Sequence, residues 1–137
     1  MNIRLYQESD AKSVSDLWNE VFPENPQHNA PTLVITKKLK VQPELFFVAE
    51  KDCAIIGTIM AGYDGHRGWL YTVAVSPQYR RQGIGSQLVQ HAESALSTLG
   101  CPKINLQVRA SNAGVVAFYE RLGYVIEERI SMGKLIK

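Results

Sequence analysis

Cysteine is scarce in this chain of 137 residues, which contains only Cys53 and Cys101. The two form no Cys-x-x-Cys pair, and no histidine stands at metal-ligand spacing from either of them. Neither a zinc site nor a disulfide framework is therefore indicated. We expect two buried or half-buried free thiols, no bound metal and a reducing, cytoplasmic location.

Long apolar runs are also missing. The longest, Ala54–Tyr63, is far shorter than the roughly 20 apolar residues that a membrane-spanning helix needs. The N-terminus lacks a basic region followed by an apolar stretch, so no signal peptide is indicated. Both absences favour a cytoplasmic protein without a membrane partner.

Charge of one sign is not in large excess, because the net charge is +2 and charged residues make up 20% of the chain. Basic residues are scattered, except in the segments 37–40 and 80–81. Nucleic acid is therefore not an expected partner. With a hydrophobic content of 45%, the length suits one domain, residues 1–137, with a core of its own.

The spacing of apolar residues predicts a mixed α/β fold. Helices are expected after the cap residues Ser9 and Asn112, and a third begins at Gly83. Three consecutive strands with short turns, one of them Lys51–Asp52, indicate an antiparallel meander. Three prolines mark 23–31 as a loop. The expected strands are 2–6, 45–50, 54–63, 69–75, 103–108 and one or two within 124–137; the expected helices are 10–22, 32–41, 83–99 and 113–122.

The segment Arg80-Arg81-Gln82-Gly83-Ile84-Gly85 lies between an apolar strand and an amphipathic helix. Its two glycines remove side chains where the helix begins, so that backbone N–H groups and the positive end of the helix dipole can hold a phosphate. The two arginines add positive charge. The segment predicts an anion site, and the diphosphate of a nucleotide-like cofactor is the anion that suits it best.

Other phosphate-binding motifs fit this segment less well. A P-loop would need a lysine after the second glycine, where Ser86 stands. A dinucleotide-binding fingerprint would need a third glycine where Leu88 stands, and an acidic residue about 20 positions further on. A plain strand-to-helix turn remains the structural alternative for the two glycines.

Three separated motifs resemble the GNAT superfamily of N-acetyltransferases. The first is Leu70–Pro77, like the core strand of that family, and the second is Arg80–Gly85, like its coenzyme A loop. The third is Asn112 to Tyr119 followed by Leu122-Gly123-Tyr124. The resemblance covers nearly the whole chain. The segment Gly62–Gly68 also resembles small bacterial acetyltransferases of the YpeA type.

The resemblance implies a mostly antiparallel twisted sheet of six to seven strands, splayed at the core strand, with about four helices. It also implies acetyl-CoA as the cofactor. The backbone amides of Arg81, Gly83, Gly85 and Ser86 would face the diphosphate. The implied cofactor-binding residues are Val73, Ala74, Val75, Arg80, Arg81, Gln82, Gly83, Ile84, Gly85, Ser86, Asn112 and Tyr119.

The resemblance also implies how the reaction would run. The core strand carries a bulge, and an amide near Val73 or Ala74 would polarise the thioester carbonyl. Tyr119 would be the catalytic acid that protonates the leaving thiolate. The sequence alone favours a core aromatic residue at Tyr119, and Asn112 lies on the same helix face as Tyr119.

A carboxylate that would deprotonate the amine is missing from the strands 69–75 and 103–108. Glu50, Asp64, His66 and Tyr71 are the candidate bases, although strand-end or turn roles explain them equally well. The leading hypothesis is an N-acetyltransferase in which an amine of a small molecule or peptide attacks acetyl-CoA directly. A non-catalytic acyl-CoA sensor and the transfer of a longer acyl group are the alternatives.

The expected acceptor cleft is bounded by the loop 23–31, the helix 32–41 and the turn Asp64–Gly68. Sheet edges commonly form dimers in this family, so the apolar segment Tyr124–Ile136 is a candidate surface for a homodimer.

Overall fold

The computed structural model describes residues 1–24, 26, 28 and 30–136. It divides into two units, Met1–Gln107 and Val108–Lys137. The first unit holds the sheet with three helices, and the second holds one helix and the C-terminal segment. That the whole chain works as one acetyltransferase domain stays a prediction.

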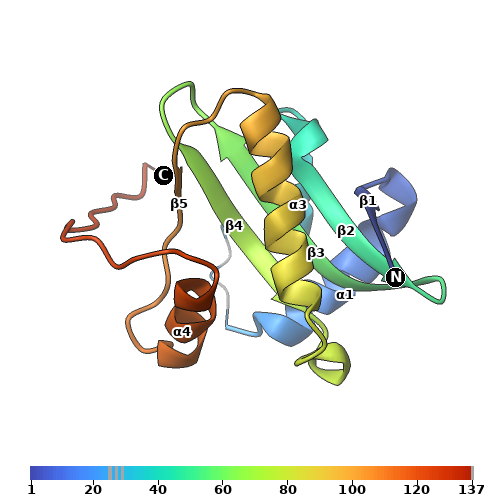
Figure 1. The fold of residues 1–137 in the computed structure, drawn as a ribbon. Coiled ribbons are helices and arrows are strands. Elements are labelled where there is room, and N and C mark those ends of the chain that lie inside the picture. The colour runs from blue at the N-terminus through green and yellow to red at the C-terminus, as the bar shows by residue number, and fades with distance from the viewer. Residues whose placement is uncertain (25, 27, 29, 137) are drawn as a thin grey trace. The chain divides into compact units, whose positions relative to one another are not determined.

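A five-stranded sheet is the framework of the first unit (Figure 1). Its strands follow one another in chain order, and every neighbouring pair is antiparallel except β4 with β5, which is parallel. The mixed, mostly antiparallel sheet and the meander are thereby confirmed. The strands are β1 Asn2–Leu5, β2 Phe46–Lys51, β3 Ala54–Tyr63, β4 Gly68–Val75 and β5 Ile104–Asn105.

The expected count of six to seven strands was wrong. Among the residues that the structure describes, 124–136 contain no strand, and β5 is only two residues long where 103–108 was expected. Alternating apolar residues mark a segment that can pair, but a strand forms only where a neighbouring backbone completes the ladder. The side chains of Val125, Ile126 and Ile130 are at least three quarters exposed.

Four helices are present in the described residues, as expected. They are α1 Ala11–Val21, α2 Pro31–Lys38, α3 Ile84–Thr98 and, in the second unit, α4 Ala113–Arg121. None of them is long and apolar enough to cross a membrane. The loop expected at 23–31 ends where α2 begins, and its residues 25, 27 and 29 lie outside the described part of the chain.

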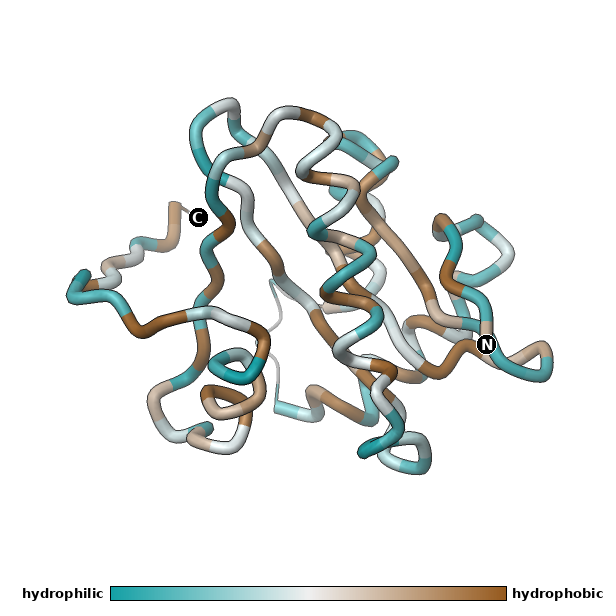
Figure 2. Tube along the Cα trace, viewed as in Figure 1, coloured by the Kyte–Doolittle hydropathy of each residue, from teal (hydrophilic) through white to brown (hydrophobic). Residues whose placement is uncertain are grey.

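The two faces of the sheet bury separate apolar layers, with α3 on one face and α1 on the other (Figure 1). On the α1 face, burying each large aliphatic side chain contributes roughly 1.5–3 kcal/mol. Along α3, apolar and polar residues alternate at helical spacing, as Figure 2 shows, and Leu88, Ala92 and Leu96 are fully buried. The α1-side cluster consists of Val14, Leu17, Trp18, Ile35, Phe46, Val48, Met60 and Ala74.

The start of α1 differs from the expectation, because Ser9 does not cap it. A short 3-10 turn, Glu8–Asp10, precedes the helix. The Asp10 carboxylate accepts a hydrogen bond from the Gln7 amide at 2.9 Å and two from the Arg4 guanidinium at 2.8 and 2.9 Å. The hydrogen bond from Arg4 holds the pKa of Asp10 below its ordinary value. A paired acid thus displaces serine from the cap position.

The β2–β3 hairpin is shifted by one residue from the expected Lys51–Asp52 connection. Lys51 pairs with Ala54, so the turn consists of Asp52 and Cys53, whose φ angles are 52° and 64°. Both lie in the left-handed region that two-residue hairpin turns require. Cys53 is therefore exposed, against the expectation of a buried or half-buried thiol, whereas Cys101 is half-buried.

Gly57, in β3, is expected to tolerate no side chain. A Cβ at this position would lie 2.9 Å from Leu88 Cδ1 and 3.1 Å from the Ala74 carbonyl oxygen. We expect Gly57→Ala to lower the free energy of unfolding by about 1–3 kcal/mol, because the packed helix must shift. Urea denaturation followed by tryptophan fluorescence measures this.

Gly62→Ala, on the same strand, is the matched control. Its Cβ would have no neighbour nearer than 3.6 Å. We expect it to leave stability unchanged or to raise it by about 0.5–1 kcal/mol. Equal losses in the two variants would contradict close packing of α3 on β3.

Candidate active site

A β-bulge interrupts the pairing of β3 with β4. Thr58 pairs with Ala74 and Met60 with Tyr71, so Thr72 and Val73 together oppose the single residue Ile59. Thr72 has a φ of 52°, the left-handed conformation that the first residue of one bulge type adopts and that glycine normally supplies. The bulge that the resemblance implied for the core strand is therefore present.

The other edge of β4 is paired only at its beginning. Gly68 pairs with Ile104 and Trp69 with Asn105. From Leu70 to Val75, the part of the chain that the structure describes supplies no further partner strand on that side. From Leu70 onward, past the level of the bulge, the described residues place no strand beside this edge of β4. That this is the splay implied by the resemblance stays a prediction.

The N-terminus of α3 has unpaired backbone donors. Gly83 is the residue before the helix, its φ is 79°, and no side chain caps the end. The helical hydrogen bonds begin with that from the Gln87 amide to the Gly83 carbonyl oxygen at 3.1 Å. The amides of Ile84, Gly85 and Ser86 belong to the first turn and have no helical partner. Donors of this kind, together with the helix dipole, can bind an anion.

The backbone conformation at position 83 requires glycine, because residues that carry a side chain rarely adopt it. A Cβ at Gly83 would meet no atom within 4 Å, so open space lies in front of the helix end. The space is open to a ligand, and the chemistry of the donors fits an anion.

The loop before α3 is positively charged. Arg80, Arg81 and Gln82 are exposed, and Arg80 Nε donates a hydrogen bond to the Val75 carbonyl oxygen at 3.2 Å. Arg81 has a φ of 65°. No Asp or Glu occurs between residues 65 and 92, so the local field favours a polyanion.

The bulged strand and the helix end lie next to each other. A Cβ placed on Gly57 would lie 3.1 Å from the Ala74 carbonyl oxygen and 3.5 Å from Ile84 Cγ2. The first turn of α3 therefore packs against β4 at Ala74. The structure brings together the predicted residues 73–75 and 80–86 in one region of the first unit.

Asn112 and Tyr119 belong to the second unit. Asn112 is the N-cap of α4 by position, and its carbonyl oxygen accepts from the amides of Val115 and Val116, but its side chain makes no capping bond. The Tyr119 ring meets Phe118 and Tyr124 edge-on, at centroid distances of 4.9 and 5.7 Å. Burial raises the pKa of Tyr119 to about 12, so the phenol keeps its proton.

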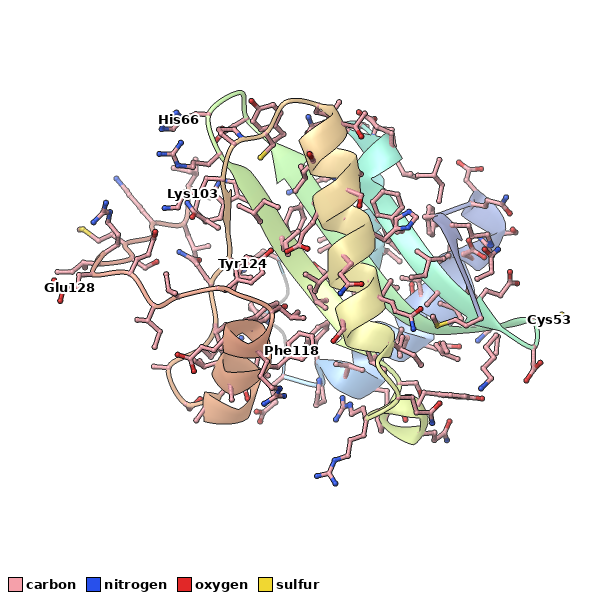
Figure 3. The ribbon with its side chains drawn as sticks, viewed as in Figure 1. Cys53, His66, Lys103, Phe118, Tyr124 and Glu128 are labelled. Carbon is pink, nitrogen blue, oxygen red and sulfur yellow. The ribbon has the colours of Figure 1, made fainter. Side chains whose placement is uncertain are left out.

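Three of the four candidate bases have other roles. Glu50 Oε1 accepts from Arg4 Nε at 3.2 Å on the far strand β2. Asp64 Oδ1 accepts from the backbone amides of His66 and Arg67, which lowers the pKa of this exposed carboxyl group and closes the turn. His66 is exposed in that turn (Figure 3). Burial raises the pKa of the fourth candidate, Tyr71.

Lys38, in the last turn of α2, was missed by the sequence analysis. It is only 5% exposed, its ammonium group donates to the Ala61 carbonyl oxygen at 2.5 Å, and it lies 5.4 Å from the centre of the Tyr71 ring. Burial lowers its pKa from 10.5 to about 8. Lys38 follows the buried Ile35 by three positions and so shares its face of α2, a helical spacing from which its burial could have been predicted.

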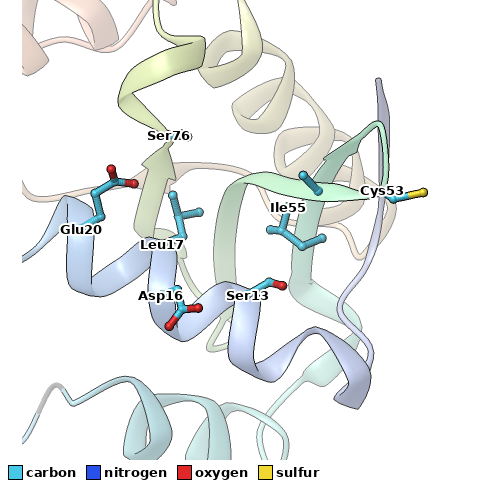
Figure 4. A pocket seen from close by; sticks show the side chains of 8 residues that line it. Ser13, Asp16, Leu17, Glu20, Cys53, Ile55 and Ser76 are labelled. Atoms are coloured by element: carbon cyan, nitrogen blue, oxygen red, sulfur yellow. The ribbon is translucent and has the colours of Figure 1, made fainter.

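A polar hollow between α1 and the β2–β3 turn is shown in Figure 4. Two of the residues around it, Asp16 and Glu20, are acidic, so it repels a diphosphate. Cys53 is at its rim. The hollow is therefore not the coenzyme site. It is lined by Ser13, Asp16, Leu17, Glu20, Cys53, Ala54, Ile55 and Ser76.

The family model described as Acetyltransferase (GNAT) family matches residues 11–124. The chain belongs to this family. An acetyltransferase of Yersinia enterocolitica is 42% identical over 134 residues, which are 98% of this chain and 94% of that relative. One of Pectobacterium atrosepticum is 41% identical over the same shares. The protein is accordingly an acyltransferase with acetyl-CoA as its cosubstrate.

Solved structures have the same fold. The PaiA N-acetyltransferase of Thermoplasma acidophilum, solved in complex with coenzyme A, has a TM-score of 0.81 at 19% identity and covers 94% of this chain and 92% of its own. The Ard1 protein of Thermoplasma volcanium has a TM-score of 0.81 at 25% identity, covering 92% of this chain and 83% of its own.

The buried Lys38 makes stability depend on pH in this GNAT protein. The folded pKa, about 8, lies below the ordinary 10.5, so the unfolded chain binds more protons between these values and stability rises with pH there. Relative to Lys38→Met, wild type is expected to gain about 3 kcal/mol between pH 8 and 10.5.

Chemical denaturation at a series of pH values measures this difference. Lys37→Met, at an exposed position, removes the same charge and is expected to follow wild type throughout. A constant difference between wild type and Lys38→Met over this range would contradict the burial of the ammonium group.

Proposed function

We propose that this enzyme transfers the acetyl group of acetyl-CoA to an amine by direct attack of the amine on the thioester. The observation that supports this most is the position of unpaired backbone donors at the start of α3, next to the bulge of β4. One set of donors suits a diphosphate and the other a thioester carbonyl.

Binding of the coenzyme falls to the loop and the first turn of α3. The amides of Ile84, Gly85 and Ser86 lack helical partners, and we assign them, with those of Arg81 and Gly83, to the phosphate oxygens. The arginine side chains add positive charge, and dissolved salt screens its attraction for the phosphate groups. The pantetheine arm would lie along the free edge of β4 from Val75 toward the bulge, adding backbone hydrogen bonds as an extra strand does.

Activation of the thioester falls to β4. An amide of the bulge, at Val73 or Ala74, would donate to the carbonyl oxygen as negative charge develops on it. As the tetrahedral intermediate collapses, the C–S bond breaks and the electron pair stays on sulfur. Tyr119 would then give its proton to that sulfur; burial raises the pKa of the phenol to about 12, so it still carries that proton at neutral pH.

The acceptor is a small molecule or peptide with an amine. The loop 23–31, α2 and the turn 64–68 would form its cleft. In support, the Gln42 side chain donates to the Tyr63 carbonyl oxygen and accepts from the Tyr63 amide, at 3.0 and 2.9 Å, which ties the segment after α2 to this turn. Water would take the proton of the amine, because the carboxylates Glu50 and Asp64 are engaged elsewhere.

Direct attack has support from a protein of the same fold. The aminoglycoside acetyltransferase AAC(6′)-Iy, at 19% identity and a TM-score of 0.81, was solved with the bisubstrate analogue CoA-S-monomethyl-acetylneamine. Such a ligand unites both substrates without an enzyme-bound intermediate. Membership of the YpeA-type group, a cytoplasmic location and a homodimer stay predictions. A non-catalytic sensor is disfavoured because close relatives are named acetyltransferases.

The coenzyme site is tested by placing a charge at Gly83. We expect wild type to bind acetyl-CoA in a calorimetric titration, and Gly83→Asp to bind it about 100-fold more weakly, since a carboxylate at the helix end repels the diphosphate. Gly83→Asn introduces a side chain of the same size as Asp and with the same tolerance of a left-handed φ, but without the charge. Its affinity for acetyl-CoA should therefore fall much less. Equal affinity of all three proteins for acetyl-CoA would contradict binding of the diphosphate at this helix end.

The acid role of Tyr119 is tested by Tyr119→Phe, which removes only the hydroxyl group. Release of free thiol from acetyl-CoA, measured with a panel of amines, should fall about 10²–10⁴-fold in kcat, with the affinity for acetyl-CoA unchanged. Phe118→Leu, one residue earlier on α4, is the control for ring packing. An unchanged kcat in Tyr119→Phe would assign the residue to packing alone.

A further inference from the structure

Thr58 is a fully buried polar residue in the middle of β3 that the reaction, as derived so far, does not use. Its exposed fraction is 0%, and that of Trp18, on α1, is 2%. The Trp18 indole N–H donates to Thr58 Oγ1 at 2.8 Å, and Thr58 Oγ1 donates to the Thr72 carbonyl oxygen at 3.2 Å. The Thr58 hydroxyl group thus donates its one proton to the carbonyl oxygen of the bulge residue Thr72, and it accepts a hydrogen bond from Trp18 in the core.

The carbonyl group that Thr58 holds belongs to the strained residue of the bulge. Thr72 has a φ of 52°, which is unfavourable for a β-branched side chain and persists only where the surroundings enforce it. Trp18 and Thr58 are both buried, so water cannot replace either hydrogen-bond partner. The pair fixes the conformation of Thr72 from the α1 face of the sheet.

The direction of the Thr72 carbonyl group decides the direction of the next amide. The peptide bond between Thr72 and Val73 is planar, and the described chain contains no cis peptide bond. In a trans peptide, C=O and N–H point opposite ways. Because the Thr72 oxygen points at Thr58 Oγ1, the Val73 N–H points away from that hydroxyl group, and beyond Trp69 the described residues place no partner strand on the far edge of β4.

We propose that Thr58, supported by Trp18, is the positioning residue that aims the Val73 amide at the thioester carbonyl. This inference rests on the proposed function and goes beyond it. It selects Val73 rather than Ala74 as the donor to the developing oxyanion, and it assigns a part in catalysis to a side chain on the opposite side of β4 from the coenzyme.

The first experiment uses wild type, labelled with ¹⁵N. Addition of acetyl-CoA, compared with coenzyme A, should shift the Val73 amide resonance downfield more than that of Ala74, because only acetyl-CoA carries the carbonyl group. A larger response at Ala74 than at Val73 would overturn the inference. If neither ligand moves any amide of β4 or of the first turn of α3, the proposed function itself fails.

The second experiment compares three variants by thiol release with the most active amine of the panel. Thr58→Val has the same shape without the hydroxyl group, and its kcat should fall at least tenfold while KM for acetyl-CoA changes less than threefold. Thr58→Ser restores the hydroxyl group and should recover kcat to within threefold of wild type.

Val14→Ala is the control for loss of core stability. Val14 is fully buried on α1 in the same apolar cluster, and its truncation leaves both hydrogen bonds of Thr58 in place, so the melting temperature should fall while kcat stays within threefold of wild type. If Thr58→Val keeps wild-type kcat, or if Val14→Ala loses as much kcat as Thr58→Val, the positioning role is wrong and the proposed function still stands.

Discussion

A buried or bound backbone amide needs a hydrogen-bond partner, and this fold leaves two groups of amides without one at neighbouring places. One group is the first turn of α3 after Gly83, where no side chain caps the helix. The other is the outer edge of β4, which loses its partner strand after Trp69. The contact of Ile84 with the β3–β4 layer at Gly57 holds the two groups together. The remaining elements of the first unit serve to keep these donors in place.

The electrostatics of the first unit favour the same region. Its basic residues Arg80 and Arg81 stand at the helix end, and the chain has no acidic residue from 65 to 92. The acidic residues Asp16 and Glu20 surround the hollow beside α1 instead. A polyanionic coenzyme is thus attracted to the end of α3 and repelled from the other concave surface.

Local signals were sufficient for the parts of the site that lie close together in sequence. Alternation and helical spacing predicted four of the strands and all the helices, and Gly83 and Gly85 marked the start of α3. What failed depended on distant partners. Asp10, which pairs with the distant Arg4, stands at the cap position instead of Ser9, and the apolar residues of 124–136 form no strand. Thr58 lies within an apolar run, and its partners Trp18 and Thr72 are distant in sequence. Periodicity carries no information about such pairs.

The order of strands in the sheet has a consequence for how the first unit folds. The strands β2, β3 and β4 are joined by short turns and pair with their sequence neighbours, so loop closure between them loses little chain entropy. Strand β1 ends at Leu5 but pairs with β2, which begins at Phe46 only after α1 and α2 have been traversed. We therefore expect the central meander with α3 to be the low contact-order nucleus, and the N-terminal strand to dock later in the folding reaction.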